Sequence, residues 1–212
     1  MKTFPDLFNS PIAISNQHDF LSSKEIEEVL KFTKNLSSEG SKVYNPSQDD
    51  NTLNTDVRVS NIKWIPKVEE IRWLYAKIYQ KIHEDNSWLW QFKLKEDFEQ
   101  IQYTEYYGEQ KGQYDWHVDI GLNTHCFRKI SVTLQLSNPS EYEGGYLQLN
   151  SFGNIDPQHL ENTPGNPQYI KTIKKQKGTI TIFPSFTPHR VSPVTKGTRK
   201  SLVIWVGGCA FK

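Results

Sequence analysis

The most informative strand of the chain reads Arg199-Lys200-Ser201-Leu202-Val203-Ile204-Trp205-Val206. Side chains alternate between the two faces of a β-strand, so this stretch has two different faces. One face carries Leu202, Ile204 and Val206, and the other carries Arg199, Ser201, Val203 and Trp205. Apolar residues on both faces predict a strand that is covered on both sides. The first face suits packing against helices, and the second, with Arg and Ser, suits the interior of a barrel that contains a polar site.

Short segments of strand-forming residues fill the chain from residue 98 onward, separated by turn residues such as Gly144-Gly145 and Lys196-Gly197. The predicted strands are 98–106, 114–120, 130–136, 146–150, 178–183, 189–192 and 198–207. Residues 151–168 are rich in Gly, Pro and Asn and predict a long loop, which is often a functional feature.

Two helices are predicted before these strands. Ser22 and Glu25 have the spacing of a capping box, and apolar residues then recur at helical period. That first stripe consists of Ile26, Val29, Leu30 and Thr33. The second helix begins near Pro66 and ends at residues 84–86, with a stripe of Val68, Ile71, Leu74, Ile78 and Ile82. The polar segment 39–56 predicts a surface loop.

The order of these elements predicts a mainly β fold, a double sheet with the N-terminal helices packed on one outer face. We expect one domain over residues 1–212, with a helical part at 1–97 and a β core at 98–212. The length of 212 residues is enough for one sizeable core.

Composition restricts the partners and the compartment. The 25 Lys and Arg residues nearly balance the 24 Asp and Glu residues, which disfavours binding to long nucleic acid or to an acidic membrane. No apolar run predicts a signal peptide or a membrane span. Cys126 and Cys209 lie far apart, so we expect two reduced structural thiols in a cytoplasmic protein.

A metal site is predicted from three residues. On a strand, His117 and Asp119 would project to the same side, and His189 supplies a third donor after another predicted strand. Two His and one carboxylate leave coordination positions open, as in non-haem iron(II) oxygenases, although the donor types also suit zinc. A buried hydrogen-bonded pair explains His117 and Asp119 equally well when they are taken alone. The similar spacing in residues 83–85 falls at a helix end, and we interpret it as solvated.

Arg199 follows His189 by ten residues, across a turn through Pro193 and Gly197. We expect it on the antiparallel neighbour of the His189 strand, facing inward. A buried guanidinium requires an anionic partner. That partner is either a protein carboxylate or a small dicarboxylate whose other end chelates the metal.

These residues resemble a known family. The segments 107–119 (YGEQKGQYDWHVD), 128–136 (RKISVTLQL), 141–147 (EYEGGYL) and 183–199 (FPSFTPHRVSPVTKGTR) are similar to the prolyl 4-hydroxylase-like branch of iron(II)/2-oxoglutarate dioxygenases, and most of all to its bacterial PKHD-type hydroxylases. The resemblance spans about residues 98–206, and together its motifs are highly specific.

The resemblance implies a double-stranded β-helix, or jelly roll, that uses Fe(2+), 2-oxoglutarate and O₂, with ascorbate as a further candidate cofactor. His117, Asp119 and His189 match the metal ligands, and Arg199 matches the residue that binds the distal carboxylate of 2-oxoglutarate. We expect four more residues in the pocket. Tyr107 matches a co-substrate-binding Tyr, and Trp205 matches a pocket-lining aromatic residue. Ser201 lies beside Arg199, and Gln135 stands where some relatives have a second Tyr.

The expected function is hydroxylation coupled to decarboxylation of 2-oxoglutarate to succinate, with prolyl residues of a peptide or protein as substrate. Related halogenases lack the carboxylate ligand, so Asp119 favours hydroxylation. Two alternatives stand beside this: the same chemistry on a small metabolite or nucleobase, and a jelly-roll module that binds a metal and a small acid without catalysis. Apart from the resemblance, the residues predict neither the identity of the substrate nor the oligomeric state. Tyr103 and Tyr106 are interpreted as core residues, and the four lysines at 171, 174, 175 and 177 as the solvated face of an edge hairpin.

Overall fold

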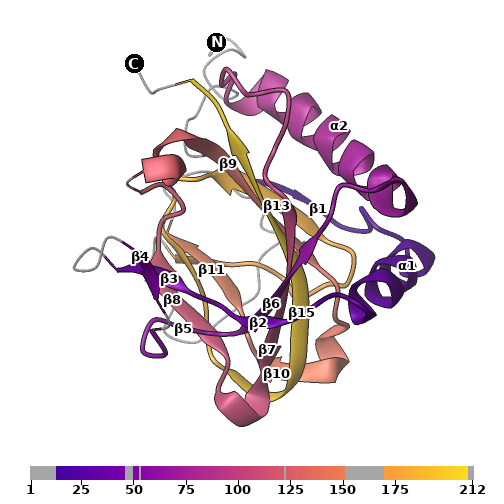
Figure 1. The fold of residues 1–212 in the computed structure, drawn as a ribbon, viewed down its shortest axis with the longest axis vertical. Helices are drawn as coiled ribbons and strands as arrows, with labels where there is room; N and C mark the ends of the chain where they lie inside the picture. The colour runs from indigo at the N-terminus through magenta and orange to yellow at the C-terminus, as the bar shows by residue number, and fades with distance from the viewer. Residues whose placement is uncertain (1–12, 46–49, 53, 122, 151–169, 210–212) are drawn as a thin grey trace, which may run out of the picture.

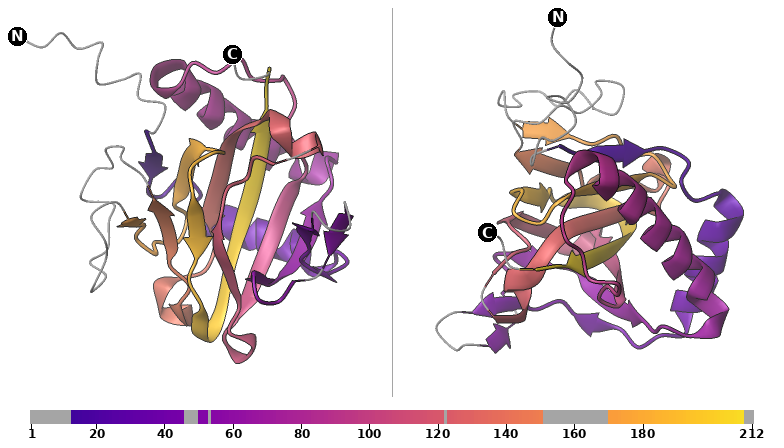
Figure 2. Two further views of the ribbon diagram at one scale, coloured as in Figure 1. Left: turned by 90° about the vertical axis from the view of Figure 1, so that its left-hand side faces the viewer. Right: turned by 90° about the horizontal axis from the view of Figure 1, so that it is seen from above.

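Two antiparallel sheets face each other, and two helices cover the outer side of the larger sheet (Figures 1 and 2). The computed structural model describes residues 13–45, 50–52, 54–121, 123–150 and 170–209. The larger sheet has the order β1-β13-β9-β15-β7-β6-β2, and β10 also pairs with β15. The smaller sheet has the order β12-β11-β14-β8-β5, and β3 pairs with β4 in a separate hairpin. The arrangement is the predicted jelly roll.

The bounds of the elements are as follows. The larger sheet contains β1 (Ser15–Gln17), β2 (Glu39–Gly40), β6 (Asn61–Ile65), β7 (Ile101–Tyr107), β9 (Arg128–Gln135), β10 (Tyr142–Gly144), β13 (Ile180–Pro184) and β15 (Val194–Gly207). The smaller sheet contains β5 (Arg58–Val59), β8 (Gln113–His117), β11 (Leu147–Asn150), β12 (Ile170–Thr172) and β14 (His189–Val191). The hairpin is β3 (Val43–Asn45) and β4 (Asp50–Thr52). The helices are α1 (Ser23–Lys34), α2 (Arg72–Leu89) and the short 3-10 helices η2 (Glu69–Ile71), η3 (Gly108–Gln110), η4 (Asn123–Phe127) and η5 (Pro139–Glu141).

The helix α1 begins as predicted. Ser22 accepts a hydrogen bond from the Glu25 backbone N–H, and the Glu25 carboxylate accepts one from the Ser22 backbone N–H, so the capping box is present. Ile26 and Val29 on its inner face are buried in the same core as Ile78 of α2 and Leu202 of β15. This core lies between the helices and the larger sheet.

Several predicted boundaries were wrong. The helix α2 continues through residues 84–86 to Leu89, and Val68, placed in its buried stripe, lies before it and is 39% exposed. Asp85, expected at a solvated helix end, is instead buried within α2, where it pairs with Lys81. Segment 39–56, predicted as a loop, contains β2, β3 and β4. These strands have two or three residues each, too short for a periodic pattern to reveal them. The predicted loop at 151–168 lies outside the described residues.

The strand β15 has the two faces that its sequence predicts. Leu202, Ile204 and Val206 are buried against the helical layer. On the inner face, Arg199 and Ser201 are 4% and 1% exposed. The partners of β15 differ from those expected, because it pairs with β7, β9 and β10 and not with β14. The chain therefore crosses from the smaller sheet to the larger one between Val191 and Val194.

Two further predictions concern the surface. Both cysteines are unpaired, as expected, but both are exposed and neither packs in the core. Across the described part of the chain, none of the helices combines the length and apolar character that crossing a membrane would require.

Candidate metal centre

His117 and His189 lie directly opposite each other on neighbouring strands of the smaller sheet. His117 ends β8, and His189 begins β14. The next paired residues are Tyr114 and Val191, so three steps along β8 correspond to two steps along β14. This bulge places Tyr114 on the same side as His117, and their rings stack with centroids 3.5 Å apart.

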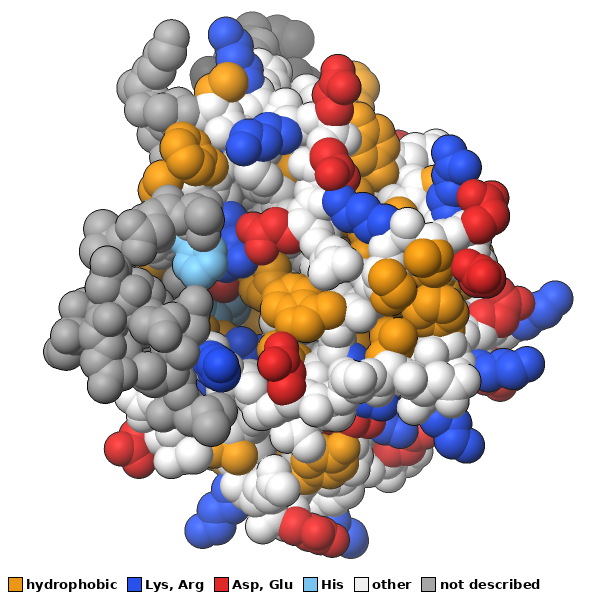
Figure 3. Space-filling view, viewed as in Figure 1, with side chains coloured by type: hydrophobic (Ala, Val, Ile, Leu, Met, Phe, Trp, Pro, Cys, Tyr) orange, Lys and Arg blue, Asp and Glu red, His pale blue; other side chains and the backbone are white. Residues whose placement is uncertain are grey.

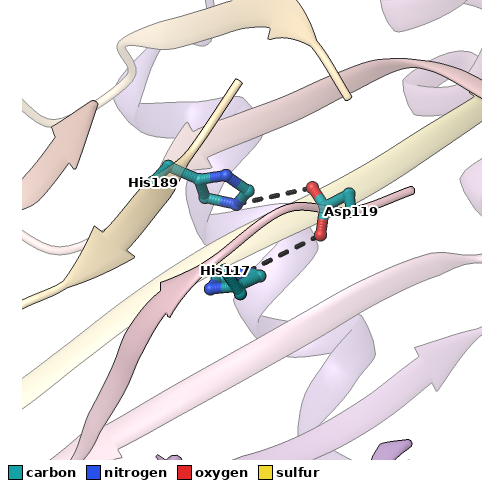
Figure 4. A group of neighbouring side chains, drawn as sticks. All are labelled: His117, Asp119 and His189. Carbon is teal, nitrogen blue, oxygen red and sulfur yellow. Dashed lines mark ion pairs between the residues drawn. The ribbon is translucent and has the colours of Figure 1, made fainter. Parts of the chain in front are cut away.

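Asp119 completes the group from a position just beyond β8. Its backbone N–H donates to the Ser185 carbonyl at 2.9 Å, which fixes the segment that follows the strand. Its carboxylate lies between the two imidazoles, with Oδ1 3.7 Å from His117 Nε2 and Oδ2 3.4 Å from His189 Nε2 (Figure 4). The ligand atoms of the three residues all lie within 4.8 Å of one another. Asp119 and His189 are 8% and 5% exposed.

Hydrogen bonds orient each of the three side chains. The Nδ1 atoms of His117 and His189 lie 2.7 Å and 2.9 Å from the backbone carbonyl oxygens of Asp115 and Thr187. A carbonyl can only accept, so Nδ1 carries the proton and the Nε2 lone pair faces Asp119. The Ser131 hydroxyl donates to Asp119 Oδ2 at 2.6 Å. Such outer partners are typical of metal sites, where they fix the tautomer and orientation of the ligands.

The charge states of these groups also suit a metal. Burial, together with the neighbouring His189, lowers the pKa of His117 to about 3, so this imidazole is neutral at pH 7. Burial alone would raise the pKa of Asp119, but the two histidines and the Ser131 hydroxyl outweigh it and lower that pKa to about 2. Two imidazoles and one carboxylate are the donor set of the non-haem iron(II) facial triad, which leaves positions open for other ligands.

Arg199 lies on the inner face of β15, in the sheet opposite this centre. Its guanidinium lies 5.5 Å from the ring centroid of Tyr106 and donates to the Ser201 hydroxyl at 3.0 Å. Among the described residues no carboxylate forms an ion pair with it. Gln135 lines the same cavity and donates to the Tyr142 hydroxyl at 3.0 Å. Arg199 and Gln135 therefore line one cavity, and Ser201 contacts Arg199.

Tyr107 does not join them. On β7 the direct cross-strand partner of Arg199 is Tyr106, while Tyr107 points to the other face and donates to the Glu105 carboxylate at 2.7 Å. That hydrogen bond and burial raise the pKa of Tyr107 to about 12, so the hydroxyl keeps its proton at neutral pH. Tyr106, interpreted as a core residue, is buried as predicted and is also the tyrosine beside Arg199. The expected placement of Tyr107 is corrected to Tyr106, because strand alternation puts only one of two adjacent tyrosines inside.

Trp205 lies further along the inner face of β15. The Arg128 guanidinium stacks over its ring at 4.0 Å and also pairs with Glu99. The Trp205 Nε1 atom is buried without a hydrogen-bond partner in the described structure. An unmatched buried donor costs roughly 1–3 kcal/mol, so an acceptor from a bound molecule would fit here.

The residues that surround this site escaped prediction for different reasons. Ser131 and Tyr114 reach it through long-range strand pairing, of which a single sequence gives no signal. Lys174 and Lys175, expected on a solvated face, are half-buried and line the cavity of Arg199.

The space-filling view in Figure 3, which has the orientation of Figure 1, shows histidine side chains at a hollow in the surface, bordered by basic and acidic groups.

Comparison with known proteins gives consistent results. Residues 101–207, just over half of the chain, match the 2OG-Fe(II) oxygenase superfamily. A PKHD-type hydroxylase of Psychrobacter sp. is 38% identical over 104 residues, which is 46% of this chain and 34% of that relative. The PKHD-type hydroxylase YbiX of Escherichia coli is 34% identical over 99 residues, 44% of this chain and 37% of the relative. The matches thus span little more than a third of these relatives' lengths.

The fold is also found in solved structures. A prolyl-4-hydroxylase of Pseudomonas putida superimposes with a TM-score of 0.65 and 20% identity, covering 93% of this chain and 94% of that one. A prolyl hydroxylase of Trichoplax adhaerens, in complex with a hypoxia inducible factor peptide fragment, gives a TM-score of 0.67 and 20% identity, with 93% and 84% covered. The fold, the His-Asp-His centre and the match over residues 101–207 agree, and the chain belongs to the 2OG-Fe(II) oxygenase superfamily.

Proposed function

We propose that this chain is an iron(II)- and 2-oxoglutarate-dependent hydroxylase that acts on prolyl residues of a peptide or protein. His117, Asp119 and His189 would hold the iron, and Arg199 would bind the distal carboxylate of 2-oxoglutarate. The observation that carries the proposal is Arg199, a residue only 4% exposed that has no carboxylate partner in the described structure and lies on the inner face of the sheet opposite the His-Asp-His group. An unpaired buried cation is costly, so a dicarboxylate that bridges Arg199 and the metal accounts for both features.

When bound, iron(II) and 2-oxoglutarate supply the oxidising chemistry: one O₂ is divided between the hydroxylated substrate and succinate, with release of CO₂. The protein positions the groups. Ser131 keeps the Asp119 carboxylate turned toward the two imidazoles, and the carbonyls of Asp115 and Thr187 keep both Nε2 lone pairs available. Arg199 and Ser201 on the far wall fix the direction in which the co-substrate lies.

Support for a prolyl substrate comes from similarity. The relatives are named PKHD-type hydroxylases, and the solved structures of like fold include a prolyl hydroxylase in complex with a peptide fragment. A peptide or protein would therefore be the partner of this chain.

Oxygen-free titration with iron(II) and 2-oxoglutarate tests the metal and co-substrate. A keto acid that chelates iron(II) gives a visible charge-transfer band, which wild type should show and which Ala at 117, 119 or 189 should abolish. Far-ultraviolet circular dichroism would verify that each variant is folded. A full-strength band in His189→Ala would show that the third ligand is wrongly assigned.

Turnover is tested separately. In air the loaded protein should form succinate slowly, and faster with a proline-containing peptide, whose mass should rise by one oxygen atom. Binding of 2-oxoglutarate without succinate formation on any peptide, amino acid or nucleotide would favour a binding module. Faster succinate formation with a nucleobase or metabolite alone would keep the chemistry and replace the substrate.

A further inference from the structure

A second buried arginine lies beside the metal centre. Arg58 belongs to β5, the edge strand of the smaller sheet, and pairs directly with Tyr114 of β8. It is 7% exposed, and its guanidinium lies 4.6 Å from the centroid of the Tyr114 ring. The same ring stacks on His117 at 3.5 Å. One aromatic side chain therefore joins Arg58 to a proposed metal ligand.

The side chain of Arg58 crosses the interior between the two sheets. Its Nη2 donates to Gln102 Oε1 of β7 at 2.7 Å, and its Nε donates to the Ser60 hydroxyl at 3.1 Å. Both acceptors are neutral. Within the described ranges no carboxylate pairs with Arg58, and its side-chain hydrogen bonds use Nε and Nη2.

The bound co-substrate would not neutralise this charge. A dicarboxylate that spans the metal and Arg199 has its distal carboxylate at Arg199, which faces Tyr106 on β7. Arg58 reaches β7 at Gln102, four residues further along the same strand. Arg128, the other buried arginine near the centre, already has Glu99 at 2.6 Å. Arg58 thus remains a largely buried cation that has no anionic partner among the described residues, and a bound anion would be stabilised beside it.

We propose that Arg58 recognises a carboxylate of the substrate that is oxidised, so that this substrate is a carboxylic acid with its reacting C–H bond near the acid group. The inference rests on the proposed function and narrows its substrate class. A guanidinium can grip a carboxylate with two parallel hydrogen bonds, and Nη1 is available for them. The carboxylate can come from the free C-terminus of a peptide or from an acidic side chain beside the proline.

Three proline peptides distinguish these sources: one with a free C-terminal carboxylate, the same peptide as its carboxamide, and the carboxamide with Asp before the proline. Succinate formation with each gives kcat/KM for wild type, Arg58→Gln and Arg58→Lys. Arg72→Gln is the matched control, since Arg72 is an exposed arginine paired only with Glu69. We expect wild type to prefer one acidic peptide over the neutral one by about 10- to 100-fold, as a charge-assisted hydrogen bond predicts.

The preference should vanish in Arg58→Gln, partly survive in Arg58→Lys and be unchanged in Arg72→Gln. A role of Arg58 that is only structural would lower all three kcat/KM values together and leave their ratios intact, which would overturn the proposal. Equal use of acidic and neutral peptides by wild type would overturn it as well.

A second measurement does not depend on prolyl turnover. Propionate and propionamide are added, at equal ionic strength and without oxygen, to protein saturated with iron(II) and 2-oxoglutarate, and the midpoint of thermal unfolding is recorded. Propionate should raise the midpoint in wild type more than propionamide does, and Arg58→Gln should lose this difference. If no peptide is hydroxylated but propionate still stabilises through Arg58, the prolyl assignment fails and the acid-binding role stands. No difference between propionate and propionamide in wild type would reject that role.

Discussion

The variant Arg199→Ala tests whether this chain binds 2-oxoglutarate through Arg199 or only holds a metal ion. Arg199 is 4% exposed, and its guanidinium lies 5.5 Å from the Tyr106 ring centroid and has one neutral hydrogen-bond acceptor, Ser201. A carboxylate placed here would receive charge-assisted hydrogen bonds, which contribute roughly 1.5–3 kcal/mol each. Arg199→Ala should therefore weaken 2-oxoglutarate binding by on the order of 100-fold or more, since about 1.4 kcal/mol corresponds to tenfold.

The assay is an oxygen-free titration of 2-oxoglutarate into iron-loaded protein, followed by the charge-transfer band. Iron affinity should change little, because Arg199 is not a ligand. Arg199→Lys should lose less, because it keeps the charge but not the two-pronged geometry. The control is Lys200→Ala: Lys200 is half-buried and pairs in register with Glu105 on the opposite face of the strand. Normal binding in Arg199→Ala together with a defect in Lys200→Ala would refute the assignment.

Three further predictions test the centre and its surroundings. Ser131→Ala removes the 2.6 Å hydrogen bond to Asp119 and should weaken iron(II) binding by about 10- to 100-fold in a competition titration, whereas unchanged affinity would deny Ser131 this role. In metal-free protein the pKa of His117 is lowered to about 3, whereas it is about 6.5 in the unfolded chain. Between these two pH values only the unfolded state binds this proton. Stability should then fall by up to about 1.4 kcal/mol per pH unit from 6.5 toward 3, measured by urea unfolding, and His117→Gln should flatten that slope. Tyr106→Phe should weaken 2-oxoglutarate binding more than Tyr107→Phe, and the reverse order would restore the role first assigned to Tyr107.

Much of the β core could be predicted because its strands carry long periodic patterns. The segment 199–206 carries apolar residues on both faces, and on each face most of the residues are buried. The hairpin β3–β4 and the strands β2 and β5 have two or three residues each, so no alternation distinguishes them from a loop. Arg58 was missed for this reason, since its strand is only Arg58–Val59.

The sequence predicts which three residues form the metal centre but not how they are arranged. We expected His117 and Asp119 to share one face of a strand, yet β8 ends at His117 and Asp119 lies beyond it. The carboxylate reaches the imidazoles through contacts distant in sequence, from its backbone to Ser185 and from its side chain to Ser131. Such contacts depend on which strands become neighbours, and no local pattern encodes that.

The crossing between β14 and β15 explains how one short segment supplies two opposite walls of the site. If His189 and Arg199 lay on paired strands, as their spacing suggested, both would project from one sheet and compete for the same space. The chain instead leaves the smaller sheet after Val191, and the Pro193 carbonyl accepts a hydrogen bond from the Gly145 backbone N–H at 3.0 Å. Gly145 has φ +61°, and a Cβ there would lie 3.0 Å from Arg199 Cδ, so a glycine gives the guanidinium its room. Under the proposed function, 2-oxoglutarate would then span the two sheets, with one end at the metal and the other at Arg199. The proposal therefore rests on the sheet crossing more than on the spacing of ten residues.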